Sequence, residues 1–239
     1  MAGAGTAGDI NNDGYDDLIV GSHGYDNGQA NEGRAWVFQG SELGLLTIPS
    51  TVLEIDVPQA SFGYSTFTAG DVNGDFFDDV IVGAFGYSNG MDTAQGAAFV
   101  YAGSETGVTN TPAWSFYGSQ ADAWFGLSAQ TAGDVNNDDY DDIIVSSERY
   151  DVTRTDQGRA WVFLGSASGL STGIDWYTSG VQTDEVFGWR SAGAGDVNGD
   201  GLDDVIVGAR RYDNGEPNEG RAVVYYGPLP ATDCSYSNP

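Results

Sequence analysis

The chain has 239 residues and a formal net charge of −27, with 35 acidic residues against 8 basic ones, all of them arginine. Binding to DNA or RNA phosphates needs clustered basic side chains, so this balance argues against a nucleic-acid partner. A single histidine and a single cysteine argue against a histidine-based triad, a thiol site or a zinc cluster. No stretch is apolar over a length that could span a membrane, and the chain is long enough for one stable core.

An Asp/Asn-rich loop recurs four times along the chain. The copies are Asp9–Asp17 (DINNDGYDD), Asp71–Asp79 (DVNGDFFDD), Asp134–Asp142 (DVNNDDYDD) and Asp196–Asp204 (DVNGDGLDD). Their first residues lie 62, 63 and 62 positions apart. This regular spacing predicts a repeat architecture.

Each loop has the oxygen-rich spacing that suits a calcium ion. Ca²⁺ takes about six to eight oxygen ligands, and loops supply them from alternating positions. Side-chain oxygens at positions 1, 3, 5 and 9 and the backbone carbonyl at position 7 form the predicted set. These ligands are Asp9, Asn11, Asp13, Tyr15 and Asp17; Asp71, Asn73, Asp75, Phe77 and Asp79; Asp134, Asn136, Asp138, Tyr140 and Asp142; and Asp196, Asn198, Asp200, Leu202 and Asp204.

The same residues also favour turns without any metal, so a single copy would be compatible with a solvated acidic turn. Four copies with oxygens at the same positions favour metal binding, and we expect up to four Ca²⁺ ions, one per loop. Position 6 is glycine in the first and fourth loops, Asp139 in the third and Phe76 in the second. A left-handed conformation at Phe76 would cost roughly 1–2 kcal/mol, which predicts that the second site is the weakest.

The loop is predicted to join two β-strands. A helix-loop-helix calcium site needs a glutamate at position 12, whereas every copy here has valine there, at the end of a β-branched run such as Leu18–Val20. Such runs, followed by small residues, are typical of buried strands.

The rest of each repeat predicts three further strands. A Phe-Gly pair precedes three of the loops, and after the buried strand come a tyrosine-led turn, a glycine-led strand and a looser last strand. The Phe-Gly pairs are Phe62-Gly63, Phe125-Gly126 and Phe187-Gly188; the turn tyrosines are Tyr25, Tyr87, Tyr150 and Tyr212; the glycine-led strands begin at Gly33, Gly96, Gly158 and Gly220; the last strands contain Val52, Trp114 and Trp176. We therefore predict an all-β chain, organised as a single domain, with repeats at about 1–61, 62–124, 125–186 and 187–230 and a short tail at 231–239.

The combination of Phe-Gly, acidic loop and Gly-Ala resembles FG-GAP repeats, the blades of the integrin α-subunit β-propeller. The resemblance covers essentially the whole chain and implies four-stranded blades with calcium between their first two strands. It also implies a protein or glycan ligand on the opposite face, where the turn tyrosines are candidates; packing between blades is an equally good explanation for them.

Integrin-like propellers have seven blades, whereas this chain has four repeats. Three arrangements follow: a closed four-blade ring, half of a larger ring completed by a homodimer, or a fragment of a larger propeller. Open blades would expose apolar faces and strand edges, so closure or association is expected.

The resulting functional hypothesis is a non-enzymatic binding or adhesion module, extracellular or on the cell surface, in which calcium is structural. The alternatives are a lectin-like propeller and an accessory domain of a larger secreted enzyme. Arg34, Arg159 and Arg221 open three of the third strands, and a structural hydrogen bond explains them better than anion recognition does. Cys234 is most simply an incidental thiol in the tail; a bond to another part of a parent protein is the alternative.

Overall fold

The computed structural model describes residues 2–229, and the tail with Cys234 lies outside this range. The chain forms antiparallel sheets joined in sequence order. The first sheet contains β1 (Ala2–Gly8), β2 (Asp17–Ser22), β3 (Arg34–Phe38) and β4 (Thr51–Leu53). The second contains β5 (Phe62–Gly70), β6 (Asp79–Ala84), β7 (Ala97–Tyr101) and β8 (Trp114–Tyr117). The third contains β9 (Ser128–Gly133), β10 (Asp142–Ser147), β11 (Arg159–Phe163) and β12 (Trp176–Ser179), and the fourth contains β13 (Phe187–Gly195), β14 (Asp204–Ala209) and β15 (Arg221–Tyr225).

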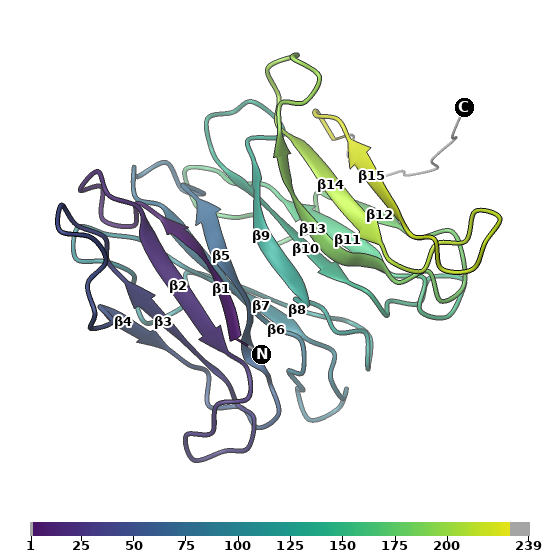
Figure 1. Ribbon diagram of the computed structural model, residues 1–239, viewed down its shortest axis with the longest axis horizontal. Coiled ribbons are helices and arrows are strands. Elements are labelled where there is room, and N and C mark those ends of the chain that lie inside the picture. The colour runs from purple at the N-terminus through teal and green to yellow at the C-terminus, as the bar shows by residue number, and fades with distance from the viewer. Residues whose placement is uncertain (1, 230–239) are drawn as a thin grey trace.

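The sheets follow one another across the molecule as consecutive blades, from the purple first sheet to the yellow end of the fourth (Figure 1). The predicted all-β architecture and four-stranded blades are confirmed, and the fourth sheet has three strands within the described residues. The looser strands around Val52, Trp114 and Trp176 form the outer edges as β4, β8 and β12.

The hydrophobic core lies between the sheets. One cluster joins the first and second sheets, another the second and third, and another the third and fourth. In the first of these, Ile19 and Val37 of one sheet pack with Val82 and Tyr101 of the next, all of them buried. The near-continuous apolar runs in the sequence therefore arise because an inner strand is covered on both faces by neighbouring blades.

The Phe-Gly pair joins successive blades. Phe62 is fully buried, and its backbone pairs in parallel with Gly33 of the preceding blade; Phe125 pairs in the same way with Gly96, and Phe187 with Gly158. A Cβ atom added to Gly33 would lie 2.1 Å from the Phe62 carbonyl oxygen, so no side chain fits there. The glycine that opens the third strand is thus required by the close approach of the next blade.

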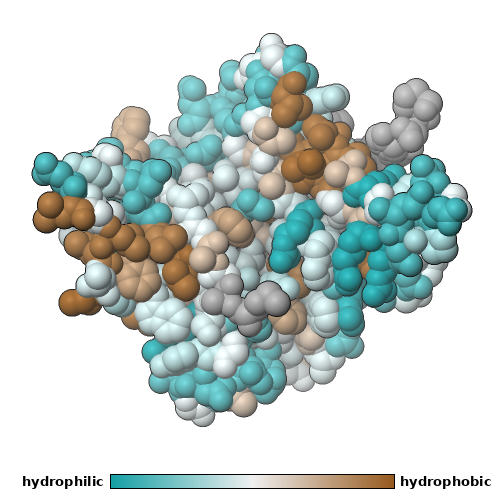
Figure 2. Space-filling model, viewed as in Figure 1, coloured by the Kyte–Doolittle hydropathy of each residue, from teal (hydrophilic) through white to brown (hydrophobic). Residues whose placement is uncertain are grey.

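The four blades form an open arc. Among the described residues, the strands of the first sheet make no extensive contact with those of the fourth. We call the side of the first sheet that points away from the second sheet the leading face of the arc. On this face Val20 and Trp36 are half-exposed, although their counterparts Val82 and Phe99 are buried. Figure 2 shows apolar surface over the first sheet and over β14. Of the three predicted arrangements, the closed four-blade ring differs from the observed arc, and the two that need further blades remain.

Candidate functional site

The acidic loops connect the first and second strands of every sheet. They join β1 to β2, β5 to β6, β9 to β10 and β13 to β14, at the same end of each blade. Because each loop starts from the end of an antiparallel strand pair, both ends are held by the sheet. The loops are therefore equivalent positions of a repeated scaffold.

The aspartate at position 1 organises each loop through backbone hydrogen bonds. In the first loop, one Asp9 oxygen accepts the N–H of Asp13 at 3.0 Å, and the other accepts the N–H of Gly14 at 2.8 Å. The corresponding bonds to positions 5 and 6 are made by Asp71, Asp134 and Asp196. The aspartate at position 5 then accepts the N–H of position 7, as Asp13 does from Tyr15 at 3.0 Å.

The aspartate at position 9 anchors the loop to the sheet. Asp79 is buried, and its two carboxylate oxygens accept the N–H groups of Val72 at 3.3 Å and Gly103 at 2.9 Å. Asp17, Asp142 and Asp204 make the same pair of bonds. Burial raises the pKa of the Asp79 and Asp142 carboxyls to about 7, and it also raises the pKa of Asp17.

The aspartate at position 8, which is outside the predicted ligand set, connects neighbouring loops. The Asp78 carboxylate accepts the N–H of Asp9 at 2.8 Å, and the Asp78 N–H donates to the Asp9 carbonyl at 3.2 Å. Burial raises the pKa of Asp78, and that of Asp141 at the next junction to about 6. In the sequence, this residue is visible only as the first of the two aspartates that end each motif. Its role as an acceptor from the preceding loop needs the neighbouring blade.

The residues present suit a hard cation by their chemistry. Each loop gathers carboxylate, amide and carbonyl oxygens with no competing nitrogen or sulfur ligand, which is the set that Ca²⁺ prefers. In this structure the carboxylates accept backbone hydrogen bonds, and among the described residues no group of three or more acidic, histidine or cysteine side chains meets at one point. The predicted ligands are therefore placed on common loops, and their assignment to calcium remains a prediction.

Position 6 is left-handed in all four loops, with φ values of 88° at Gly14, 70° at Asp139 and 90° at Gly201, and the second loop differs in placing a phenylalanine there. Phe76 at position 6 has φ = 71°, a left-handed conformation, and its side chain is 78% exposed. The amide at position 3 donates to the carboxylate at position 5 in the other loops, at 2.9–3.0 Å (Asn11 to Asp13, Asn136 to Asp138, and Asn198 to Asp200). Within the described residues, Asn73 makes no such bond to Asp75.

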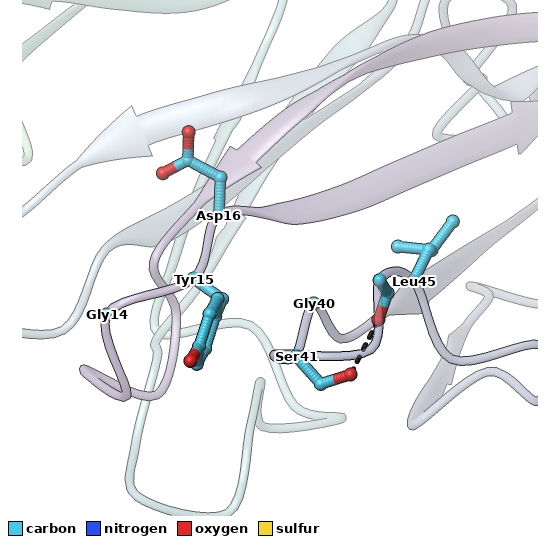
Figure 3. Close-up of a pocket in the computed structure, with 7 residues that line it drawn as sticks. Gly14, Tyr15, Asp16, Gly40, Ser41 and Leu45 are labelled. Atoms are coloured by element: carbon cyan, nitrogen blue, oxygen red, sulfur yellow. Dashed lines mark hydrogen bonds between the residues drawn. The ribbon is translucent and has the colours of Figure 1, made fainter.

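A shallow cavity of about 370 Å³ lies beside the first loop, lined by Tyr15, Asp16, Ser41 and Leu45 among others. Figure 3 shows the Asp16 carboxylate pointing away from the Tyr15 ring, and the Ser41 hydroxyl donating to the Gly44 carbonyl at 2.6 Å. Leu45 is exposed here, whereas Leu170, at the corresponding position of the third blade, is buried against the second. This cavity thus lies on the uncovered leading face of the arc.

The turn tyrosines pack inside their own blades. The guanidinium of Arg34 lies 4.5 Å from the Tyr25 ring centroid and also pairs with Glu54. Arg159 lies over the Tyr150 ring and donates to the Ser179 hydroxyl. Arg221 lies over the Tyr212 ring and pairs with Glu185. The arginines make structural hydrogen bonds, as predicted. The tyrosines are half-buried, and their ring contacts are with their own blade, which differs from the expected packing between blades.

An aromatic and arginine cluster lies on the face opposite the loops and was not predicted from the sequence. The guanidinium of Arg149 lies 3.5 Å from the Trp124 centroid, and that of Arg210 lies 4.1 Å from the Trp189 centroid. Arg210 also pairs with the buried Glu148 at 3.5 Å. These residues follow the second strand or flank the Phe-Gly pair, so only the packing of blades brings them together.

No helix in the part of the chain that the structure describes could cross a membrane. The profile of the FG-GAP repeat matches residues 1–38, 125–163 and 187–225. Integrin alpha-6 of Homo sapiens is 30% identical over 162 residues, which cover 68% of this chain and 14% of that protein. Integrin alpha pat-2 of Caenorhabditis briggsae is 28% identical over 238 residues, covering 90% of this chain and 18% of the relative.

Phosphatidylinositol-glycan-specific phospholipase D of Rattus norvegicus is 34% identical over 149 residues, covering 58% of this chain and 17% of that enzyme. The chain thus spans 14% to 18% of the length of these relatives. The second blade is outside the profile match, yet it has the same strand order and the same loop-to-loop bonds as its neighbours. The matched repeats, the relatives and the blade architecture together place the chain in the FG-GAP β-propeller family.

Proposed function

We propose that this chain is a calcium-stabilised, extracellular binding module without catalytic activity of its own. The observation that carries the proposal is the repeated loop, in which aspartates at positions 1, 5 and 9 hold the backbone in one conformation at the same end of every blade. A bound Ca²⁺ would supply positive charge among these carboxylates and relieve their mutual repulsion. Adhesion or protein interaction is the function that this arrangement serves.

The predicted ligand face lies opposite the calcium loops, where the Arg149–Trp124 and Arg210–Trp189 pairs provide charge and aromatic surface. Such groups are enriched at the centres of protein interfaces. An accessory role in a larger secreted enzyme is the alternative, since one relative is by name a phospholipase. Activity would then require the longer parent chain.

The calcium proposal is tested by thermal melts in about 2 mM CaCl₂ and in EDTA, with isothermal titration of the metal at extracellular-type affinity of about 10⁻⁴–10⁻³ M. We expect the melting temperature to fall in EDTA. Asp13→Ala should remove a stronger site and Asp75→Ala a weaker one. Equal melts with and without calcium, and no heat of binding, would contradict the proposal.

A second proposal concerns the open ends of the arc: further FG-GAP blades, from a second copy or a longer chain, cover them. Gly158 contacts the next blade closely, whereas a Cβ atom on its counterpart Gly220 would have no neighbour nearer than 3.3 Å. Light scattering in calcium distinguishes the sources. A dimer of twice 25.1 kDa supports a second copy, a polydisperse aggregate supports missing blades, and a compact monomer would oppose both.

A further inference from the structure

A cavity lies between the second and third blades, beside the second acidic loop. Its volume is about 520 Å³, within the range of roughly 300–1,000 Å³ typical of small-molecule sites. The second loop and the start of β8 line one side, and the turn between β11 and β12 lines the other. The cavity is thus built from two blades and lies on the loop face.

Hydrogen bonds between the blades fix both walls of this cavity. The Ser166 N–H donates to the Val72 carbonyl at 3.1 Å, and the Trp114 indole N–H donates to the Ser171 carbonyl at 2.8 Å. Leu170 packs in the same buried cluster as Trp114 and Val100. A site with walls held in this way costs little ordering when a ligand enters.

The lining divides into an apolar wall and a polar rim. Val72, Val100, Trp114 and Leu170 form the wall and are at most 8% exposed. Asn73, Asp75, Ser168 and Thr172 contribute carboxylate, amide and hydroxyl groups at the rim. An apolar surface with a few polar groups is the usual composition of a specific small-molecule site.

This chemistry selects the class of ligand. The charge of −27 on the chain opposes an anionic ligand. A purely apolar group would cover rim oxygens without offering them hydrogen-bond donors, which costs free energy. A pyranose ring offers an apolar face of C–H groups to the wall and several hydroxyl donors to the rim.

We propose that this cavity is a binding site for a neutral saccharide residue. The ring lies against Trp114 and Leu170, and its hydroxyls bond to Ser168 and Thr172. The proposal goes beyond the binding module described above, because the site lies on the loop face and does not depend on the opposite face. The first blade lacks the aromatic wall, since Thr51 occupies the register position that Trp114 has on β8.

Saturation-transfer NMR with methyl α-mannoside, methyl β-galactoside and methyl β-glucoside, each at about 5 mM in calcium buffer, tests this proposal. Glucuronate serves as the anionic comparison. We expect at least one neutral glycoside to bind in the millimolar range typical of weak small ligands, and glucuronate to bind more weakly. Absence of binding by all three glycosides, or stronger binding of glucuronate, would overturn it.

Two variants with matched controls locate the binding. Ala167→Trp fills the cavity from an exposed position, and Glu105→Trp places the same side chain at the equivalent turn of the second blade. Ser168→Ala removes a rim hydroxyl, with Thr106→Ala as its control, since each hydroxyl contacts the preceding turn serine. We expect at least a tenfold loss of affinity for Ala167→Trp, a severalfold loss for Ser168→Ala and none for the controls. Unchanged binding in Ala167→Trp and Ser168→Ala would overturn the proposal, and the Ser168→Ala result decides the case if Ala167→Trp does not fold.

Discussion

The backbone N–H of Asp71 donates to the carboxylate of Asp141, at 2.9 Å and 70 residues further along the chain. The Asp141 N–H donates in return to the Asp71 carbonyl at 3.1 Å. The same reciprocal pair joins Asp9 to Asp78 and Asp134 to Asp203. Neighbouring acidic loops are therefore connected to one another by a defined pair of hydrogen bonds.

This contact predicts that Asp141→Ala destabilises the chain by about 1–3 kcal/mol, because the Asp71 N–H loses a partly buried acceptor. Asp16 is the matched control, since it occupies the same loop position on the leading face and is exposed. Asp16→Ala should change the free energy of unfolding by less than about 0.5 kcal/mol. Urea denaturation measures both, and equal effects would show that the contact between loops contributes no stability.

Alanine variants of Gly158 and Gly220, which precede the third strands of the third and fourth blades, test the close contact between blades. Gly158 and Gly220 have φ values of 80° and 76°, so the backbone strain of an alanine is nearly the same at both. A Cβ atom at Gly158 would lie 1.9 Å from the Phe187 carbonyl oxygen, whereas the nearest atom at Gly220 is 3.3 Å away. Gly158→Ala should therefore cost at least about 2 kcal/mol more than Gly220→Ala.

Thermal melts of the two alanine variants measure this difference. The same pair of variants also reports whether the side of the fourth sheet that points away from the third sheet is covered in solution. If Gly220→Ala is as damaging as Gly158→Ala, another blade covers the fourth sheet in solution. A small effect at Gly220 together with a monomeric mass means that the face is free.

The left-handed conformation of Phe76 predicts a stabilising substitution. Phe76→Gly should increase the free energy of unfolding by about 1 kcal/mol, because glycine adopts φ = 71° without steric cost and the phenyl ring is exposed. The variant should also bind calcium more tightly at the second loop, as isothermal titration would detect. Gly201→Phe is the reverse change in the fourth loop, where φ is 90°, and should have the opposite sign. A destabilised Phe76→Gly variant would refute this account of the second loop.

The buried Glu148 gives a pH dependence with a defined sign. Burial raises the pKa of its carboxyl above the ordinary 4.5, and the charge of Arg210 is the largest opposing influence. The folded state then holds a proton that the unfolded chain has released, so this group reduces stability as the pH rises through and above 4.5. Arg210→Ala removes the opposing charge and widens that pH window.

We expect Arg210→Ala to be destabilising by roughly 1–2 kcal/mol more at pH 8 than at pH 4, a value reduced by the exposure of the Arg210 side chain. Urea denaturation at the two pH values measures the difference. Arg154→Ala changes an exposed arginine whose guanidinium bonds to the Thr153 hydroxyl, and it serves as the control. A loss that is independent of pH would mean that Arg210 acts through its packing on Trp189.

The sequence predicted a large part of the fold because the repeat imposed the same pattern four times. The strand positions, the loop connecting the first two strands and the left-handed residue at Phe76 all follow from local spacing and backbone preference. The structural role of Arg34 was also predicted, although its partner Glu54 was not. These features depend on neighbours within one blade.

Residues whose partners lie in another blade could not be assigned in this way. Asp78 and Asp141 are part of the motif, but their acceptor role depends on a loop about 70 residues earlier. The cavity at Trp114 and the Arg210–Glu148 pair likewise need two blades to exist. The amino-acid sequence by itself determined the blade, because strand periodicity and turn chemistry act over a few residues. Only the tertiary structure decided the contacts between blades and the open arc, because these depend on how preformed sheets pack face to face.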